Sequence, residues 1–211
     1  MANSRKKREG TVFVISGPSG SGKTTLIKNF LRQKRAGSGI VKVATCTTRP
    51  PRGGEKNGRD YVFIGAAEFE RRAKKGYFLE WQRVFGQYYG TPKELVKKNL
   101  LAGRDVLLCI DVKGARALRR GGKFRFVFIF ILPSSDNWQA ELLARLEGRL
   151  SETSKQIKSR LLLAEKEIAG AKTYDYIIVN KRISRAVKQL SGIIKKERET
   201  RKNKAAQLQG S

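Results

Sequence analysis

Two adjoining stretches decide the fold: Thr11-Val-Phe-Val-Ile-Ser16 and Gly17-Pro-Ser-Gly-Ser-Gly-Lys-Thr24. The first is a short apolar run, typical of a buried strand. The second matches the pattern G-x-x-x-x-G-K-[ST], and helical spacing follows from Lys23 to about Arg35. A strand, a glycine-rich turn and a helix in this order predict a loop that binds the phosphates of a nucleoside triphosphate. A structural turn rich in Gly and Ser is the alternative, and the flanking strand and helix disfavour it.

Each type of residue in this loop has its own chemical task. Glycines allow positive φ and bring backbone N–H groups against phosphate oxygens. Lys23 supplies a point charge for the β- and γ-phosphates, and the Thr24 hydroxyl is a ligand for Mg²⁺. The motif therefore assigns triphosphate binding to Gly17, Pro18, Ser19, Gly20, Ser21, Gly22, Lys23, Thr24 and Thr25.

Strand-like and helix-like segments alternate along most of the chain. Because the strands are rich in Val, Ile, Leu and Phe, we expect an α/β fold with a mostly parallel sheet and helices on both faces. Between residues 60 and 89 the pattern changes to short pieces, which predicts a small inserted subdomain. Strands are expected at 40–44, 61–64, 77–81, 84–89, 105–110, 124–132 and 174–179, and helices at 66–75, 92–101, 112–119, within 138–169 and from 184.

Composition excludes several classes of protein. The 211 residues include 46 Lys and Arg against 18 Asp and Glu, a net charge of +28, yet 39% are hydrophobic, enough for a packed core. The absence of histidine excludes imidazole metal sites and histidine bases. Cys46 and Cys109 cannot form a disulfide framework and fit a reducing compartment. No stretch approaches the roughly 20 apolar residues of a membrane helix, and the apolar run at 11–16 is too short for a secretory leader. We expect a cytoplasmic protein without membrane attachment.

A second loop, from Thr45 to Phe63, carries the sequence Arg49-Pro-Pro-Arg52. The two prolines restrict the backbone and hold both guanidinium groups in an extended frame. Fork-shaped donors placed in this way suit a phosphate dianion. A basic, solvated loop is the alternative on composition alone.

This loop and four later motifs together resemble the guanylate kinase family over residues 10–195. The later motifs are Phe78-Leu-Glu80-Trp81, Tyr88-Tyr-Gly-Thr91, Ile110-Asp111-x-x-Gly114 and Tyr174-Asp-Tyr-x-Ile-Val-Asn180. The resemblance implies a P-loop kinase core, a small inserted GMP-binding subdomain and a helical lid. It also implies transfer of the γ-phosphoryl group of ATP to GMP, with Mg²⁺, giving ADP and GDP in purine nucleotide salvage.

The resemblance also implies boundaries along the chain. The charged segment 195–204 is expected to fray at its end of the molecule. The implied parts are a basic N-terminal arm at 1–9, a kinase-like domain at 10–195 with its core at 10–44, 92–135 and 161–195, a GMP-binding insert at 45–91, a lid at about 136–160, and a charged tail at 196–211.

Residues for the acceptor nucleotide follow from the same resemblance. It places Arg49, Arg52 and Tyr61 on the GMP phosphate and Glu80 and Asp111 near the guanine. Independent chemistry supports Glu80, because guanine offers adjacent N1–H and N2–H donors to a carboxylate while adenine presents an unprotonated N1. A carboxylate paired with one of the many cations is the alternative. The implied GMP-binding residues are Thr45, Arg49, Arg52, Tyr61, Glu80, Tyr89, Gly90, Thr91 and Asp111.

The resemblance assigns lid arginines to Arg145, Arg149 and Arg160, the first two on one helix face. A solvated cationic face is the alternative for that pair. No general base is needed, since the accepting phosphate oxygen is already ionised near pH 7. Asn180 would lie near the adenine, which adds it to the ATP-binding residues. The implied catalytic residues are Lys23, Arg49, Arg145, Arg149 and Arg160, with Thr24 as the Mg²⁺ ligand.

Several positions depart from the family pattern. Cys109 stands where the first aspartate of an Asp-Ile-Asp motif is usual, which puts the order of the metal's water shell in question. Lys113 stands for the usual Gln, Lys181 for Asp, and Leu150 for a glycine of the lid turn. Thr45 in place of Ser is chemically mild.

Three other functions stay open on the sequence. One is a catalytically impaired, guanylate-kinase-like interaction module, which the intact phosphate loop disfavours. Another is a kinase of the same fold for a phosphorylated sugar, for which a guanine-reading carboxylate has no use. The third is a basic nucleic-acid-associated protein, since a charge of +28 predicts non-specific, salt-dependent attraction to RNA. The expected assembly is a monomer or a homodimer.

Overall fold

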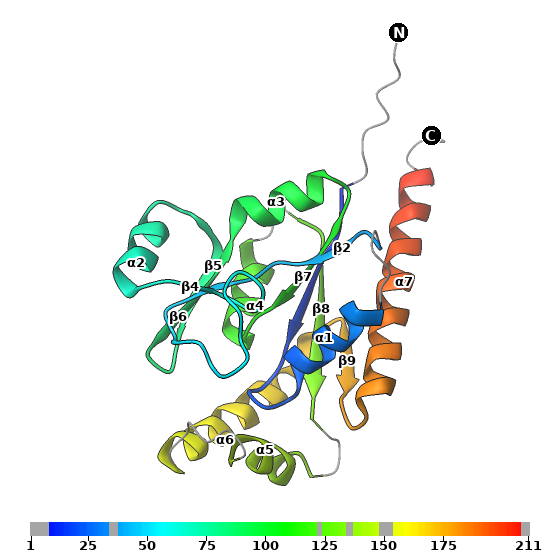
Figure 1. Cartoon of the computed structure of the whole chain (residues 1–211). Coiled ribbons are helices and arrows are strands. Elements are labelled where there is room, and N and C mark those ends of the chain that lie inside the picture. The colour runs from blue at the N-terminus through cyan, green and yellow to red at the C-terminus, as the bar shows by residue number, and fades with distance from the viewer. Residues whose placement is uncertain (1–8, 34–37, 122–123, 134–136, 148–153, 208–211) are drawn as a thin grey trace. The chain divides into compact units, whose positions relative to one another are not determined.

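The structure of the protein, a computed structural model, describes residues 9–33, 38–121, 124–133, 137–147 and 154–207 (Figure 1). The chain forms two compact units. The first combines Met1–Ser16 with Gly37–Phe128, and the second combines Gly17–Ala36 with Ile129–Ser211.

The first unit contains parallel strands β1 (Val12–Ser16), β2 (Ile40–Lys42) and β7 (Asp105–Cys109), with β7 between the other two. All five residues of β1 are buried, as are the first four of β7. Helices α3 (Lys93–Leu101) and α4 (Val112–Gly121) pack on β7 and β1 respectively. Strands covered in this way carry apolar side chains on both faces, which is why their sequences are continuously hydrophobic.

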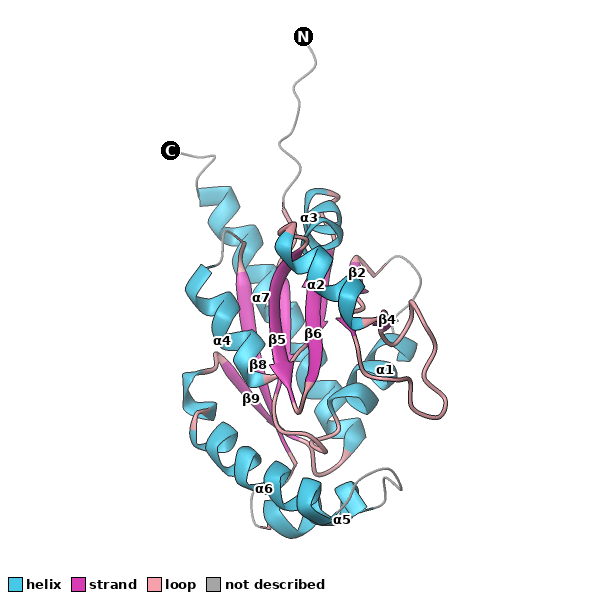
Figure 2. Cartoon of the chain, turned by 90° about the vertical axis from the view of Figure 1, so that its left-hand side faces the viewer, coloured by secondary structure: helices cyan, strands magenta, loops and turns pink. Residues whose placement is uncertain are grey.

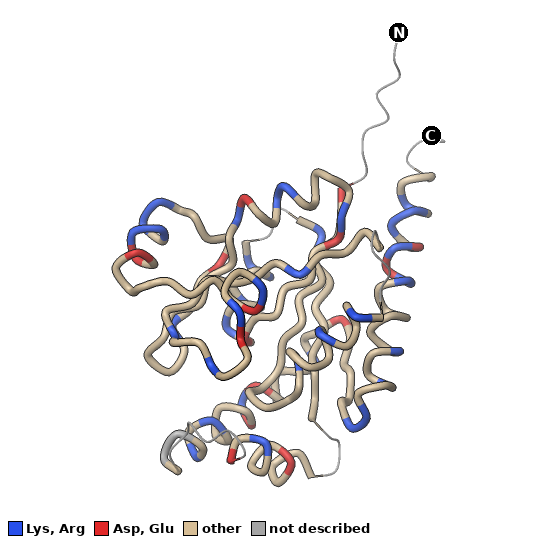
Figure 3. The backbone as a smooth tube through the Cα atoms, viewed as in Figure 1, with Lys and Arg blue, Asp and Glu red and all other residues tan. Residues whose placement is uncertain are grey.

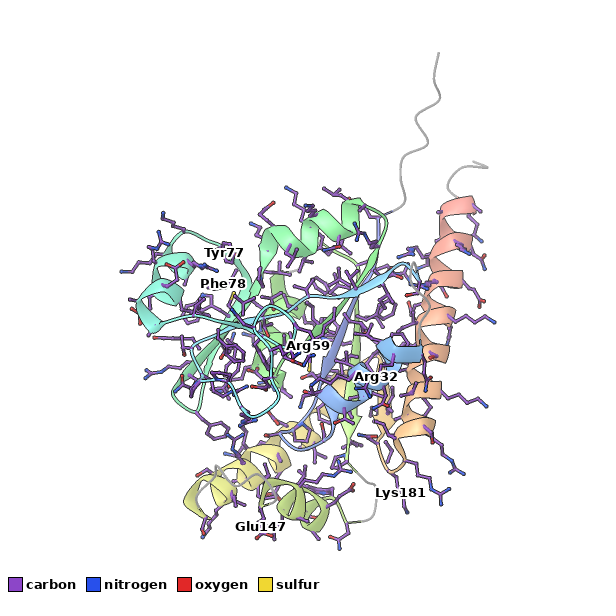
Figure 4. The ribbon with its side chains drawn as sticks, viewed as in Figure 1. Arg32, Arg59, Tyr77, Phe78, Glu147 and Lys181 are labelled. Atoms are coloured by element: carbon purple, nitrogen blue, oxygen red, sulfur yellow. The ribbon has the colours of Figure 1, made fainter. Side chains whose placement is uncertain are left out.

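A second, four-stranded sheet in the same unit has the strand order β4-β3-β6-β5, and most of it comes from the segment that the sequence predicts to be an insert. A small aromatic core holds it together: the ring of Phe69 stacks on Phe78 at 4.4 Å and on Tyr88 at 5.1 Å between centroids. Tyr77 meets Phe78 edge to face at 5.2 Å (Figure 4). The elements are β3 (Cys46–Thr47), β4 (Val62–Phe63), α2 (Ala66–Lys74), β5 (Phe78–Val84) and β6 (Gln87–Pro92).

The hairpin of this insert differs from the sequence prediction. Strands were expected at 77–81 and 84–89, but β5 and β6 run side by side on each side of a two-residue turn at Phe85-Gly86 (Figure 2). Both turn residues have positive φ, 49° and 80°. Such a turn matches the twist of paired strands. The prediction of the strand bounds was wrong because phenylalanine rarely adopts positive φ, so its presence at position 85 did not indicate a turn.

The unit boundary falls within β8 (Phe126–Leu132), whose second half pairs in parallel with β9 (Tyr176–Val179) in the second unit. Helix α1 (Lys23–Gln33) packs against α7 (Ile183–Gln207), and α7 also contacts β9 (Figure 1). With helices alternating between parallel strands, the predicted α/β fold with a mostly parallel sheet is confirmed. The remaining elements of this unit are α5 (Trp138–Glu147), α6 (Ser154–Ala169) and a 3₁₀ turn (Ala171–Thr173).

The last helix extends further than expected. Residues 195–204 were predicted to fray, yet α7 continues to Gln207. Glu197 accepts a hydrogen bond from the Tyr176 hydroxyl at 2.7 Å, and the Lys196 ammonium lies 5.7 Å from the centre of the same ring. These contacts anchor the cationic part of the helix to β9. Lys and Arg residues recur along the whole helix (Figure 3).

Within the ranges that the structure describes, no helix combines the length and apolar character needed to cross a bilayer.

Candidate active site

The phosphate loop, residues 17–24, joins β1 to α1. Gly17, Gly20 and Gly22 have φ values of 140°, 89° and 85°, a region that L side chains rarely adopt. A Cβ on Gly17 would collide with the backbone carbonyl of Ile131, and one on Gly22 with the amide of Asn180. The glycines are therefore required both by their backbone conformation and by the space around them.

Lys23 folds over its own loop. Its Nζ donates hydrogen bonds to the carbonyl oxygens of Gly17 at 2.6 Å and Pro18 at 2.8 Å. Thr24 and Thr25, at the first turn of α1, are exposed. The helix begins here, so its unpaired N–H groups and the positive end of its dipole lie beside the ammonium group. This arrangement favours an anion.

Two of the three predicted lid arginines contact the phosphate loop. The Nη1 of Arg145 donates to the Gly20 carbonyl at 3.0 Å, and the Nη1 of Arg160 donates to Ser19 Oγ at 3.0 Å. Glu141, one turn before Arg145, accepts from its other nitrogen. The structure thus brings Arg145 and Arg160 to the loop from two different helices, which a merely solvated face would not do. Arg149 and Leu150 lie outside the residues that the structure describes.

Asn180, which follows β9, is 5% exposed and braces the same loop. Its Nδ2 donates to the Ser21 carbonyl at 2.9 Å, and its backbone N–H donates to the carbonyl of Leu132 at 2.7 Å. The family resemblance implied that Asn180 lies near the adenine of ATP. The observed contacts add a second task, fixing the loop from the end of the neighbouring strand pair.

In the first unit, the acceptor loop, residues 45–63, is closed by Glu55. Its carboxylate accepts two hydrogen bonds from Nη2 of Arg49, at 3.0 and 2.9 Å, and one from the backbone N–H of Arg52 at 2.8 Å. Burial works against a charged Arg49, but the contacts with Glu55 outweigh it and raise the pKa of that guanidinium. Arg49 is therefore charged and oriented in advance. Sequence reasoning missed Glu55, although the spacing Arg-x-x-Glu in a loop rich in Pro and Gly was a signal.

Tyr61 lies against this cluster. The Arg49 guanidinium is 5.4 Å from its ring centroid, and the ring of Tyr89 is 6.3 Å away. Burial, and the nearby Cys109, raise the pKa of the Tyr61 hydroxyl, so this group stays protonated and able to donate. The loop is stiffened further by Asp60, which pairs with Arg59 at 2.7 Å.

Glu80 is buried near the open end of the β5–β6 hairpin, as the third residue of β5, and is 8% exposed. The Thr91 hydroxyl, opposite it on β6, donates to Glu80 Oε1 at 2.6 Å. Burial raises the pKa of Glu80 to about 7, the Thr91 hydrogen bond opposes this rise, and the negative charge of Asp111 adds to it. The described contact of Glu80 is thus a hydroxyl rather than the cation of the alternative interpretation.

Asp111 opens α4, where its Oδ1 accepts a hydrogen bond from the backbone N–H of Gly114 at 2.7 Å. This is the contact of a helix cap. Both carboxyl groups lie against Gly114: its backbone N–H binds Asp111, and a Cβ built on it would lie 2.6 Å from Glu80 Oε2. Two adjacent acceptors in a buried setting suit a ligand with several N–H donors.

Thr45 and Gly90 are part of the sheet that supports these groups. Thr45 is buried, and its carbonyl accepts a hydrogen bond from Val62 at 2.9 Å. A Cβ on Gly90 would lie 2.8 Å from the ring of Phe78 and 2.9 Å from that of Phe69. Close packing of the aromatic core therefore explains this glycine without a ligand.

Comparisons with known proteins show which family the chain resembles along most of its length. The family model described as "Guanylate kinase" matches residues 9–197. The guanylate kinase of Wolbachia pipientis wMel is 41% identical over 192 residues, which cover 91% of this chain and 92% of that protein. The guanylate kinase of Maricaulis maris (strain MCS10) is 43% identical over 194 residues, 92% of this chain and 86% of that one. The crystal structure of guanylate kinase from Anaplasma phagocytophilum superposes with a TM-score of 0.73 at 34% identity, covering 90% and 87% of the two chains.

Proposed function

This chain belongs to the guanylate kinase family, and on that premise we propose that it transfers the γ-phosphoryl group of ATP to GMP, giving ADP and GDP. The observation that carries the proposal is the buried Glu80, hydrogen-bonded by Thr91 within the insert. A phosphate loop serves many kinases, whereas a buried carboxylate near a second carboxyl group selects a base with adjacent N–H donors.

On the donor side, backbone N–H groups of the phosphate loop and the Lys23 ammonium bind the triphosphate. Arg145 and Arg160, which already contact the loop, place their positive charge where the transferring phosphoryl group becomes more anionic. Asn180 keeps the loop in shape. Catalysis rests on orientation and electrostatics, for which no proton-accepting side chain is needed.

On the acceptor side, Arg49, Arg52 and the Tyr61 hydroxyl bind the phosphate of GMP. Glu55 holds Arg49 ready for that contact. Glu80 accepts hydrogen bonds from N1–H and N2–H of guanine, and Asp111 lies beside it. Adenine would direct a lone pair at the same carboxylate, so AMP is rejected by electrostatic repulsion and lost hydrogen bonds.

Magnesium fits the residues present. Mg²⁺ prefers one or two protein oxygens together with phosphate oxygens and waters. Thr24 offers an exposed hydroxyl at the start of α1, and in the part of the chain that is described no group of three or more acidic, Cys or His side chains forms a protein-only metal site. When bound, Mg²⁺ neutralises charge on the phosphates. The Cys109 thiol is a poor ligand for so hard an ion, so Thr24 is the protein group we assign to it.

The setting of the reaction follows from the cysteines and the charge. Neither Cys46 nor Cys109 forms a disulfide, which fits a reducing cytoplasm. The net charge of +28 attracts anionic nucleotides and, less selectively, RNA. RNA attraction of this origin weakens steeply between 50 and 200 mM salt, and retention across that range would instead indicate a recognition surface.

A coupled assay of ADP release tests the proposed activity, with GMP and AMP as acceptors. We expect turnover with GMP and little with AMP. Lys23→Ala should abolish turnover while leaving thermal unfolding unchanged, which separates the enzyme from contaminating kinases. If the wild-type protein shows no turnover with GMP above the background of the assay, the assignment is rejected and an interaction module is favoured.

A further inference from the structure

Gly114 lies in the first turn of α4, and its backbone conformation does not require a glycine. Its φ lies outside the left-handed region that the glycines of the phosphate loop adopt. Alanine stabilises a helix by about 1 kcal/mol relative to glycine at an interior position. Another reason must therefore account for the missing side chain.

That reason is the carboxyl group of Glu80. A Cβ built on Gly114 would lie 2.6 Å from Glu80 Oε2 and 3.2 Å from its Cδ. On the other side, the Thr91 hydroxyl binds Oε1 at 2.6 Å. The carboxyl group is thus held between a hydroxyl and the bare backbone of α4, and it cannot retreat without breaking the bond to Thr91.

The same glycine also holds the second acid. Its backbone N–H donates to Asp111 Oδ1 at 2.7 Å. One residue therefore serves both carboxyl groups: its N–H fixes Asp111, and its lack of a side chain leaves room for Glu80. A side chain at position 114 would keep the hydrogen bond from the backbone N–H to Asp111 but would fill the space that the Glu80 carboxyl group occupies.

We propose that Gly114 is a positioning residue that sets purine specificity, because it lets Glu80 and Asp111 stand together as the acceptor for the 2-amino edge of guanine. This inference rests on the proposed GMP phosphorylation and names the position that tunes it. IMP has the same phosphate, sugar and N1–H as GMP but lacks the 2-amino group. If Glu80 is displaced, it loses the hydrogen bond to the 2-amino group, which is the contact that distinguishes GMP from IMP.

The test compares Gly114→Ala with Gly121→Ala. Gly121 lies on the same helix, and a Cβ there meets nothing within 4 Å. For Gly114→Ala we expect the KM for GMP to rise about tenfold to a hundredfold, the range for a hydrogen bond to a charged group. The preference for GMP over IMP should fall by a similar factor, while kcat and the KM for ATP change little. Gly121→Ala should behave as the wild type.

A double-mutant cycle shows whether the effect passes through Glu80. In a Glu80→Ala background, adding Gly114→Ala should cause no further loss of GMP preference, because the displaced group is gone. The Glu80→Ala substitution should also restore any thermal stability that Gly114→Ala alone loses. The test therefore stays usable if the Gly114→Ala variant unfolds readily. A purely structural role would give additive effects in both readouts.

The outcomes separate the two proposals. If the wild type phosphorylates GMP but Gly114→Ala keeps its KM and its preference over IMP, the role of Gly114 is rejected and the kinase assignment stands. If the wild type does not phosphorylate GMP, the assignment fails and this inference with it. Equal loss in Gly114→Ala and Gly121→Ala would show a helix effect, which also rejects the role.

Discussion

GMP binding should be coupled to ionisation of Glu80. The perturbation is a change of pH from 8 to 6 across the raised pKa of about 7. Only the carboxylate form accepts both N–H groups of guanine, so a protonated Glu80 must lose its proton before GMP binds fully. Affinity for GMP should therefore fall as the pH falls.

The magnitude follows from the raised pKa. With a pKa of about 7, the ionised fraction is roughly nine-tenths at pH 8 and roughly one-tenth at pH 6. Glu80 alone therefore weakens GMP binding about tenfold over this interval. The phosphate of GMP, with a second ionisation near pH 6, adds about twofold. At pH 7 about half a proton should leave the protein per GMP bound.

Isothermal titration calorimetry measures both quantities. Kd is determined at pH 8, 7 and 6, and at pH 7 in two buffers with different ionisation enthalpies, whose difference gives the number of protons released. Glu80→Gln is the matched control, because it keeps the size of the side chain and removes its titration. In that variant only the phosphate contribution to the pH dependence should remain.

Two results would refute this reasoning. One is the same pH dependence in the wild type and in Glu80→Gln. The other is no net proton release at pH 7 in the wild type beyond that of the variant. Either would mean that Glu80 is already ionised in the free protein or does not contact guanine.

Three further predictions concern other positions. Asn180→Ala removes a donor to the phosphate loop and should raise the KM for ATP several-fold while that for GMP stays unchanged in steady-state kinetics. Cys109→Asp should lower the Mg²⁺ concentration needed for half-maximal activity, whereas Cys109→Ser should not; equal curves for both would contradict the metal argument. Asp105→Ala leaves the buried N–H of Thr11 without its 2.8 Å acceptor and should cost about 1–3 kcal/mol in denaturant unfolding, while Asp105→Asn retains most of the stability.

The sequence predicted the donor side of the site best, because its chemistry is local. The phosphate loop depends on a strand, a turn and a helix that adjoin in the chain. The two glycines that the motif requires, Gly17 and Gly22, both have positive φ. Arg145 and Arg160 are more than 120 residues away in sequence. Only the family resemblance linked them to the phosphate loop, and the structure shows both in contact with it.

The acceptor side was harder, since its residues act through contacts that no spacing reveals. Glu55 lies in the loop from Thr45 to Phe63 and Gly114 in the motif Ile110-Asp111-x-x-Gly114, yet the sequence predicted no role for either. The role of Glu55 depends on its ion pair with Arg49, which the sequence alone does not reveal. Gly114 matters only because β5 brings Glu80 against α4. The hairpin was misplaced for a similar reason, as Phe85 adopts a conformation that its side chain type disfavours.

The arginine contacts at the phosphate loop have a calorimetric consequence. Through Nη1, Arg145 and Arg160 already donate to a neutral carbonyl and a neutral hydroxyl of the loop. An incoming triphosphate exchanges these acceptors for anionic oxygens and does not recruit side chains from solvent. Hydrogen bonds to anionic acceptors are roughly twice as strong, so we expect ATP association to release heat with little loss of side-chain freedom.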